Sequence, residues 1–265
     1  MPESGNKAIL SALEPIPSIT LAEMDGVKLL NRIDTKYLTD EATLARVLND
    51  AEKEGYRALE VDGTKISPYN SVYFDTAELR MFQDHHNRHL TRQKVRTRVY
   101  VNSQETFLEI KRKRNTGRTK KKRTTIPAAE LRDFSKDAAA VEYLAKHSNF
   151  TADMLSPVLS TEFSRITLVN PARTERVTID TNLHFNNFRT GKTASLEDAV
   201  IIELKQDGHA ASQMKGILLN NRVKPIRVSK YCIAETLTDP SARSGRFKLK
   251  VRRIEKIIDK KITVL

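Results

Sequence analysis

Arg92-Gln-Lys-Val-Arg-Thr-Arg-Val-Tyr100 and Thr106-Phe-Leu-Glu-Ile-Lys-Arg-Lys113 are neighbouring runs in which apolar and polar residues alternate. A period of two is typical of a β-strand with one apolar face, because successive side chains point to opposite sides. Turn-forming residues follow each run, at Asn102-Ser103 and at Asn115-Thr116-Gly117. We therefore predict three consecutive antiparallel strands over 92–102, 106–114 and 118–126.

The same alternation recurs elsewhere in the chain. It is seen at Arg32-Ile-Asp-Thr-Lys36, around Arg165, at Arg176-Val-Thr-Ile-Asp180 and at Glu203-Leu-Lys205. Helical periodicity is found before, between and after these strands, which predicts an α+β protein with a large antiparallel sheet. The predicted helices span 21–30, 40–54, 78–87, 127–134, 138–147, 210–220 and 229–237.

The charged faces of these strands are strongly basic. Their acidic residues are only Asp34, Glu109, Asp180 and Glu203. Like charges placed opposite one another weaken strand pairing, so a face of this kind is better explained if it surrounds an anion. Closing the sheet into a barrel would put the charges in a polar lumen and leave the apolar faces for the helices to cover. The basic residues are Arg32, Lys36, Lys94, Arg96, Arg98, Lys111, Lys113, Arg165, Arg176 and Lys205.

The charge of the whole chain is also unevenly distributed. The 265 residues carry a formal net charge of +13, but 88–123 alone carry +12 and 241–265 carry +7, which leaves −6 for the rest. Two basic blocks on a mildly acidic body indicate a polyanionic ligand or solvated surface charge. Cys232 is the only cysteine, which excludes an intrachain disulfide and a cysteine-based zinc cluster. No apolar run is long enough to span a membrane and no signal sequence is visible, so the cytoplasm is expected.

Eight short motifs follow one another along the chain. They are Arg32-Ile-Asp-Thr-Lys36-Tyr37, Tyr73-Phe-Asp-Thr76, Arg96-Thr-Arg98, Leu108-Glu-Ile-Lys111, Arg165, Arg176-Val-Thr-Ile-Asp180, Glu203-Leu-Lys205 and Ser229-Lys230-Tyr231. In this order they resemble the VTC domain, the polyphosphate polymerase branch of the triphosphate tunnel metalloenzymes (CYTH-like superfamily). The resemblance covers about residues 25–238 and implies an eight-stranded antiparallel β-barrel tunnel with a basic lumen, flanked by helices.

The resemblance also implies the site residues. Glu203 would hold Mn²⁺ or Mg²⁺, and Glu109 is either a second metal ligand or the partner that orients Lys111. Lys122 would be an eighth phosphate ligand, while Arg227 and Ser229 lie where the last helix of the family reaches the tunnel. The catalytic phosphate ligands would be Lys36, Arg96, Arg98, Lys111, Arg165, Arg176 and Lys230.

Two details of the sequence qualify this assignment. In a strand, Lys120 and Lys122 share one face while Lys121 and Arg123 share the other, so only one pair faces the lumen. The Glu-x-Glu-x-Lys motif of the wider superfamily appears here as Arg32-x-Asp34-x-Lys36. Loss of the first acid weakens the metal site of the hydrolytic members and favours the VTC branch.

The C-terminal tail differs in composition from the rest of the chain, with a net charge of +7 over residues 241–265. We expect a tunnel domain over 1–240 and a basic amphipathic helix within 241–265, whose apolar residues recur at helical spacing from Phe247 to Ile262. Docking on the chain's own domain is the ordinary role of such a helix. The other roles are a membrane surface or a membrane-protein partner, which would put the protein at the inner face of the membrane.

The function expected from these features is metal-dependent transfer of the γ-phosphoryl group of ATP to a growing inorganic polyphosphate chain. One alternative is a tunnel-fold triphosphatase that hydrolyses inorganic or nucleoside triphosphate. A second is a non-catalytic module that binds polyphosphate or nucleic acid. Specific nucleic-acid recognition is not expected, because aromatic residues are only 6% of the chain and Trp is absent.

Overall fold

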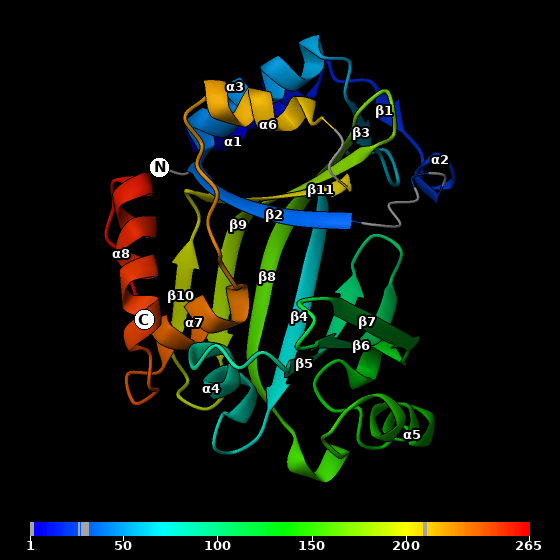
Figure 1. The fold of residues 1–265 in the computed structure, drawn as a ribbon, viewed down its shortest axis with the longest axis vertical. Helices are drawn as coiled ribbons and strands as arrows, with labels where there is room; N and C mark the ends of the chain where they lie inside the picture. The colour runs from blue at the N-terminus through cyan, green and yellow to red at the C-terminus, as the bar shows by residue number, and fades with distance from the viewer. Residues whose placement is uncertain (1–2, 26, 28–31, 209–210) are drawn as a thin grey trace.

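The structure is a computed structural model that describes residues 3–25, 27, 32–208 and 211–265. Its elements are arranged as a strongly curved sheet with helices on both sides (Figure 1). The helices are α1 (Glu3–Leu13), α2 (Leu21–Asp25), α3 (Glu41–Lys53), α4 (Arg80–His86), α5 (Ala138–His147), α6 (Gln213–Asn220), α7 (Lys230–Thr238) and α8 (Gly245–Ile258). The strands are β1 (Ser18–Ile19), β2 (Arg32–Asp40), β3 (Arg57–Leu59), β4 (Ser67–Asp75), β5 (Arg92–Tyr100), β6 (Glu105–Lys113), β7 (Thr119–Thr125), β8 (Ser156–Val169), β9 (Glu175–Asn187), β10 (Thr193–Leu196) and β11 (Ala199–Asp207).

Eight strands follow one antiparallel path, in the order β2-β11-β9-β8-β4-β5-β6-β7. This confirms the predicted α+β class and the eight-stranded antiparallel sheet. Among the described residues the two outer strands, β2 and β7, do not pair with each other, so the sheet is a curled half-barrel. The free edge of β2 is instead occupied by the connection from α6 to α7, where the amide of Ile226 donates to the carbonyl of Lys36 at 2.8 Å.

Helices cover the convex face of the sheet in two groups. α1, α3 and α6 pack over β2, β11, β9 and β8, where Leu44, Val47 and Leu48 of α3 are fully buried. α5 packs over β5 and β6, where Leu108, Ile110 and other residues form a separate cluster. Each such aliphatic side chain contributes about 1.5–3 kcal/mol of transfer free energy. The charged residues of the strands therefore remain on the concave face.

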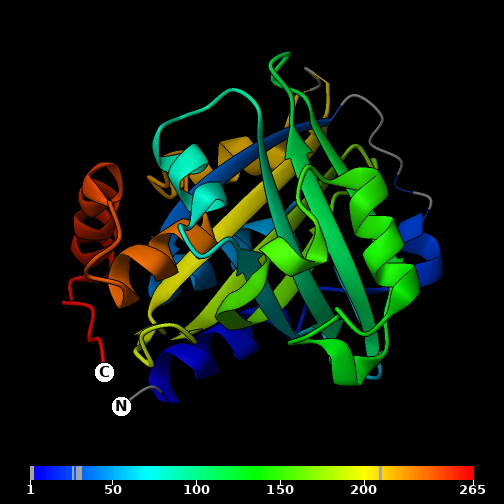
Figure 2. The same ribbon diagram turned by 90° about the horizontal axis from the view of Figure 1, so that it is seen from below.

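One end of the concave face is apolar and is closed by α7. Ser229 caps this helix by accepting from the amide of Cys232, and Tyr231 stacks on Tyr73 of β4 with ring centroids 5.1 Å apart. α8 packs against α7, with Phe247 and Ile254 buried. Figure 2 shows α8 and α5 at opposite sides of the molecule. In the first turn of α7, Lys230 binds Asp180 and the next residue, Tyr231, stacks on Tyr73. This turn therefore lies at the border between the charged and apolar parts of the concave face.

A β-bulge in β9 creates this border. Ser164 pairs with Thr181, whereas Glu162 pairs with His184, so β9 has one residue more than β8 between these pairs. Asn182 takes the left-handed conformation there, with φ of 52°. Before the bulge the even-numbered residues of β9 face the concave side, and after it the odd-numbered ones do.

Several predicted elements differ in extent from the observed ones. Only a 3-10 turn at Ala128–Glu130 forms within the helix predicted over 127–134. The helix predicted over 21–30 is observed as α2, and its positions 26 and 28–30 lie outside the described residues. α8 confirms a helix in the basic tail. No helix of the described part of the chain is long and apolar enough to cross a membrane.

Candidate functional site

Charged side chains from most strands of the sheet meet on the concave face. The cross-strand register brings Lys36 opposite Glu203, Lys205 opposite Arg176, and Arg96 opposite Glu109. Cross-strand partners share a face, so the sequence prediction of one charged face is confirmed for these strands. Three carboxylates, those of Asp180, Glu109 and Glu203, each bind two cations within this group.

Asp180 is the centre of the first group. Arg165 binds it through two parallel hydrogen bonds, Nε to Oδ1 at 2.6 Å and Nη2 to Oδ2 at 2.9 Å, and Lys230 of α7 also binds Oδ2. Burial opposes ionisation of Asp180, but the two cations outweigh it and hold its pKa well below the usual range. Burial lowers the pKa of Lys230 to about 8. The α7 lysine is thereby fixed over the sheet.

Glu109 is the centre of the second group, and its side chain is only 2% exposed. Arg96 donates from Nε to Oε2 at 2.7 Å, and Lys121 of β7 forms an ion pair with Oε1. The cations overcome the effect of burial and keep the pKa of Glu109 well below normal. Orientation of Lys111 by Glu109 was one of the two predicted roles, and it is wrong. The cross-strand neighbours of Lys111 are Lys94 and Lys121, while Glu109 binds other cations.

Glu203 is the centre of the third group. It binds Lys36 of β2 through Oε1 and Lys205 through Oε2, the latter at 3.3 Å. Burial disfavours the carboxylate form, but Lys36 and Lys205 together lower the pKa of Glu203 well below its ordinary value. Burial also lowers the pKa of Lys205 to about 8. Glu203 is therefore an ionised oxygen donor surrounded by cations.

Several cations of the concave face have no carboxylate partner among the described residues, and Arg98, Arg176 and Lys111 are three of them. Arg98 is 5% exposed and donates only to the hydroxyl of Ser71, at 2.9 Å. Arg176 keeps a buried Nε without a hydrogen-bond acceptor. Lys111 forms no ion pair, and desolvation lowers its pKa, with repulsion from Lys36 and other cations adding to it and attraction by Glu203 acting in the opposite direction. These three groups give the face an uncompensated positive charge.

The register corrects one predicted ligand. Lys122 pairs with Ile110, whose side chain is buried in the convex core, so Lys122 lies on the convex side of the sheet. Lys121 pairs with Lys111 and Arg123 pairs with Glu109, which puts these two on the concave side. Alternation separated the two pairs correctly, but it could not tell which pair faces inward, because both are basic.

Ser229 and Arg227, the two predicted site residues just before α7, lie in different parts of the site. The hydroxyl of Ser229 accepts a hydrogen bond of 2.6 Å from Lys94 of β5, which joins α7 to the charged face. Arg227 is exposed, and its charge contributes to lowering the pKa of Lys113, after the larger effect of Arg92 and that of burial. Arg227 therefore lies near the rim rather than among the buried ion pairs.

Tyr73 is a site residue that the sequence analysis did not identify. Its hydroxyl accepts from Nη1 of Arg96 at 3.0 Å, and the side chain is 6% exposed. Burial alone would raise the pKa of Tyr73, but Arg96, Arg98 and other cations outweigh it and lower the pKa to about 8. Its motif, Tyr73-Phe-Asp-Thr76, was visible in the sequence, but a strand tyrosine carries no signal that it will face cations.

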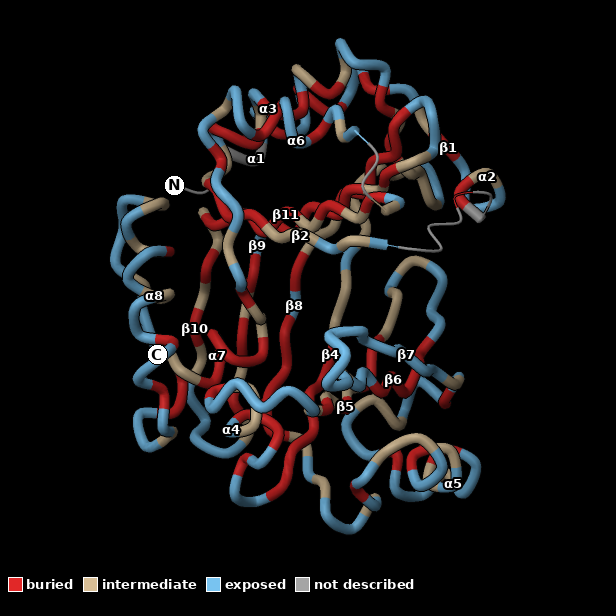
Figure 3. The backbone as a smooth tube through the Cα atoms, viewed as in Figure 1, coloured by how far each residue is buried: buried red, intermediate tan, exposed pale blue. Residues whose placement is uncertain are grey.

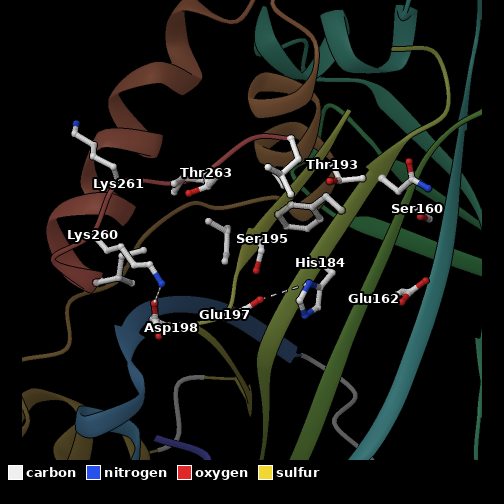
Figure 4. A pocket seen from close by; sticks show the side chains of 17 residues that line it. Ser160, Glu162, His184, Thr193, Ser195, Glu197, Asp198, Lys260, Lys261 and Thr263 are labelled. Carbon is white, nitrogen blue, oxygen red and sulfur yellow. Dashed lines mark hydrogen bonds and ion pairs between the residues drawn. The ribbon is translucent and has the colours of Figure 1, made fainter. Parts of the chain in front are cut away.

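A pocket of about 540 Å³ lies between β8–β10 and the C-terminal residues (Figure 4). His184 lies 4.0 Å from Glu197, and Lys260 binds Asp198 at 3.0 Å. Glu162 adds a third carboxylate to the lining. The lining thus has three carboxylates against two lysines, Lys260 and Lys261, so it offers no excess positive charge for the predicted phosphate substrate.

Solved structures of other proteins resemble this chain at low sequence identity. A putative adenylate cyclase from Bacillus halodurans shares the fold, with 14% identity over 76% of this chain and 96% of that chain and a TM-score of 0.51. A protein from Hippeastrum, described as a putative adenylyl cyclase with a dominant triphosphatase activity, gives 13% identity over 77% of this chain and 95% of that chain, with a TM-score of 0.47. No curated protein matches the chain. The sequence pattern of the VTC domain matches residues 31–238, and the chain therefore belongs to the VTC domain family.

Proposed function

We propose that this protein is a polyphosphate polymerase that transfers the γ-phosphoryl group of ATP to the end of an inorganic polyphosphate chain. The observation that carries the proposal is the uncompensated positive charge of Arg98, Arg176 and Lys111 on a concave face that belongs to a VTC domain. Arg98 is buried, Arg176 is half-buried and Lys111 is exposed, and a bound linear phosphate would neutralise all three. A buried cation without a carboxylate partner, such as Arg98, is costly in the free protein. Family and fold together support a triphosphate tunnel enzyme, and the polymerase activity is the finer part of the proposal.

The chain's own residues would supply positioning and charge neutralisation. Guanidinium groups bind phosphate oxygens in pairs, which suits Arg96, Arg98, Arg165 and Arg176 to a row of phosphoryl groups. Lys36, Lys111 and Lys230 would act as point charges between them. Lys121 is added to this set because the register puts it beside Lys111.

A divalent cation would complete the site. The described residues contain no group of three or more His, Cys, Asp or Glu that could hold a metal ion. Mg²⁺ needs only one or two carboxylates when substrate phosphates supply its other ligands. Glu203 and Glu109 are both ionised and both bind two cations, but the side chain of Glu203 is 17% exposed and that of Glu109 only 2%, so Glu203 is the carboxylate that an ion carried by the substrate would reach. When bound, the ion would neutralise charge on the transferred group.

The reaction requires alignment more than covalent participation by the protein. A terminal oxygen of the polyphosphate chain attacks the γ-phosphorus, a new P–O bond forms, and the bond from the γ-phosphorus to the β–γ bridging oxygen breaks. ADP leaves with that oxygen. The attacking oxygen is already an anion, so no general base is needed. Cations on both sides of the γ-phosphoryl group would stabilise its developing charge.

Hydrolysis of triphosphate is the competing proposal. It needs a carboxylate that is free to activate water. On the concave face Asp180, Glu109 and Glu203 are each bound to two cations, and Asp34 is bound to Arg32 at 2.7 Å. Binding of nucleic acid is less favoured, because Tyr73 and Phe163 of the concave face are buried and the ring of the half-buried Tyr69 is covered by Arg98 and Arg165.

The test is product analysis after incubation with ATP and Mn²⁺ or Mg²⁺. The proposal expects polyphosphate chains on a gel together with ADP. In Glu203→Gln it expects Mn²⁺ or Mg²⁺ to stimulate polyphosphate synthesis no longer. Release of orthophosphate without any chain product would assign the protein to hydrolysis instead. Full metal-dependent activity of Glu203→Gln would remove Glu203 from the metal site.

A further inference from the structure

The β6–β7 hairpin carries far more positive charge than the concave face uses. Residues 110–126 contain nine Lys and Arg and no acidic residue. The register divides the strand residues into two rows. The inner row faces the concave side and consists of Lys111, Lys113, Lys121 and Arg123.

The outer row faces the opposite side and consists of Arg112, Lys120 and Lys122. Arg112 pairs directly with Lys120, and Lys122 pairs with Ile110 of the convex core. All three are exposed, and none forms a hydrogen bond or an ion pair with any residue in the described ranges. Like charges directly opposite one another destabilise a strand pair, so this row has a cost that the fold does not offset.

The position of β7 connects the two rows. β7 is the last strand of the sheet, and on its outer edge no strand of the described chain pairs with it. Figure 3 shows β7 as exposed along most of its length. A flexible anion leaving the concave face over this edge would pass from the inner row to the outer row without losing contact with cations.

The composition of the outer row indicates the class of ligand. No large exposed hydrophobic side chain lies between residues 102 and 153. A protein partner would ordinarily need an apolar or aromatic anchor, and single-stranded nucleic acid would need aromatic rings for its bases. A row of cations alone suits a linear chain of phosphates, which has charge but no bases.

We propose that the outer row, Arg112, Lys120 and Lys122, binds the part of a polyphosphate chain that has left the concave face. This inference rests on the proposed function for the identity of the ligand. It assigns these residues to holding long chains, and they take no part in binding the triphosphate unit at which transfer occurs.

The test compares a double variant, Arg112→Gln with Lys120→Gln, with a charge-matched control on α8, Lys248→Gln with Arg252→Gln. Both control residues are exposed and lie one turn apart. Affinity is measured for long-chain polyphosphate and for tripolyphosphate over a series of salt concentrations. We expect the outer-row variant to bind the long chain roughly tenfold more weakly, with a salt slope lower by about 1.4, because each lost phosphate contact removes about 0.7.

Tripolyphosphate affinity should be unchanged in both variants, and the α8 control should bind the long chain like the unaltered protein. Unchanged long-chain affinity in the outer-row variant, or an equal loss in the α8 control, overturns the inference. Loss of affinity for an RNA homopolymer with no change for polyphosphate would assign the row to nucleic acid and also overturn it. Failure of the proposed function is distinguishable, because the unaltered protein would then make no polyphosphate from ATP.

Discussion

At the scale of single residues, the concave face contains paired and unpaired cations, and the two kinds should respond oppositely to mutation. Arg165 and Lys230 are held by Asp180, whereas Lys111 and Arg98 have no carboxylate partner. A paired cation supports the fold in the absence of ligand. An unpaired one opposes the fold and is retained for the ligand.

Lys111→Ala should remove activity without harming the fold. Lys111 is attracted by Glu203 and repelled by Lys36, Lys94 and Arg96, and Glu203 keeps two other cations when Lys111 is removed. We expect polyphosphate synthesis to fall at least about 100-fold, the order of loss when one charge-stabilising group is removed from a transition state. The melting temperature should stay the same or rise. Unchanged synthesis, or a large fall in melting temperature, would contradict this role.

Asp180→Asn should behave in the opposite way. It leaves Arg165 and Lys230 buried without their shared carboxylate, which costs about 3–5 kcal/mol when one partner of a buried pair is removed. The melting temperature of the free protein should therefore drop. Tripolyphosphate should stabilise this variant more than it stabilises the unaltered protein, because phosphate replaces the missing anion. Thermal unfolding with and without tripolyphosphate measures both effects, and equal stabilisation would contradict the account.

The pH dependence of binding follows from the lysines of the site. Burial lowers the pKa of Lys121, Lys205 and Lys230 to about 8, and the pKa of Tyr73 is also lowered to about 8. Between pH 7 and 9 the lysines lose positive charge and Tyr73 gains negative charge, so tripolyphosphate affinity should fall. Calorimetric titration at constant ionic strength measures this, and constant affinity across the range would contradict it.

The stability of the free protein should change in the other direction. A lysine whose pKa is lower in the folded state binds fewer protons there than in the unfolded state between pH 8 and its ordinary pKa of about 10.4. Stability contributed by these three lysines therefore rises with pH in that window. Denaturant unfolding without ligand should show this rise as affinity falls.

At the scale of elements, the bulge in β9 decides what the concave face contains. It directs Leu183 and Phe185 toward α7 and α8, although Arg176 and Asp180 earlier in the strand face the charged region. Without the bulge, His184 and Asn186 would point to the concave side. The strand thus changes from a charged to an apolar concave face at Asn182.

Asn182→Val should destabilise the protein, whereas deletion of Asn182 should leave it folded. A β-branched residue is disfavoured at the φ of 52° by about 1–2 kcal/mol. Deletion removes only the extra residue, so Ser164 still pairs with Thr181 and Glu162 with His184. Asn182→Gly is the matched control, because glycine adopts this φ at no steric cost. Thermal unfolding measures all three variants, and a valine variant that melts like the unaltered protein, or an unfolded deletion variant, would contradict the role of the bulge.

The sequence predicted some of these elements and could not predict others. Alternation identified the faces of β5, β6 and β11, because a strand with one core face has a strict period of two. It missed the bulge, since a single extra residue leaves the local pattern intact on both sides. It also chose Lys122 instead of Lys121, because the choice depends on the register with β6, which involves residues distant in the chain.

At the scale of the whole molecule, the net charge of +13 is divided among three places. Part lies on the concave face, part lies on the outer row of the hairpin, and part lies on α8, whose apolar face is already buried against α7 and the sheet. The apolar residues of α8 that could have entered a membrane surface, such as Phe247 and Ile254, are thus used by the chain itself. The overall charge is therefore a poor guide to affinity for nucleic acid.

The central claim is that linear phosphate binds to the concave face through its unpaired cations. The most direct measurement is a crystal structure of the protein with tripolyphosphate. The account predicts phosphate oxygens within hydrogen-bonding distance of Arg98, Lys111 and Arg176. Tripolyphosphate bound only elsewhere, at a concentration that saturates binding in solution, would contradict it.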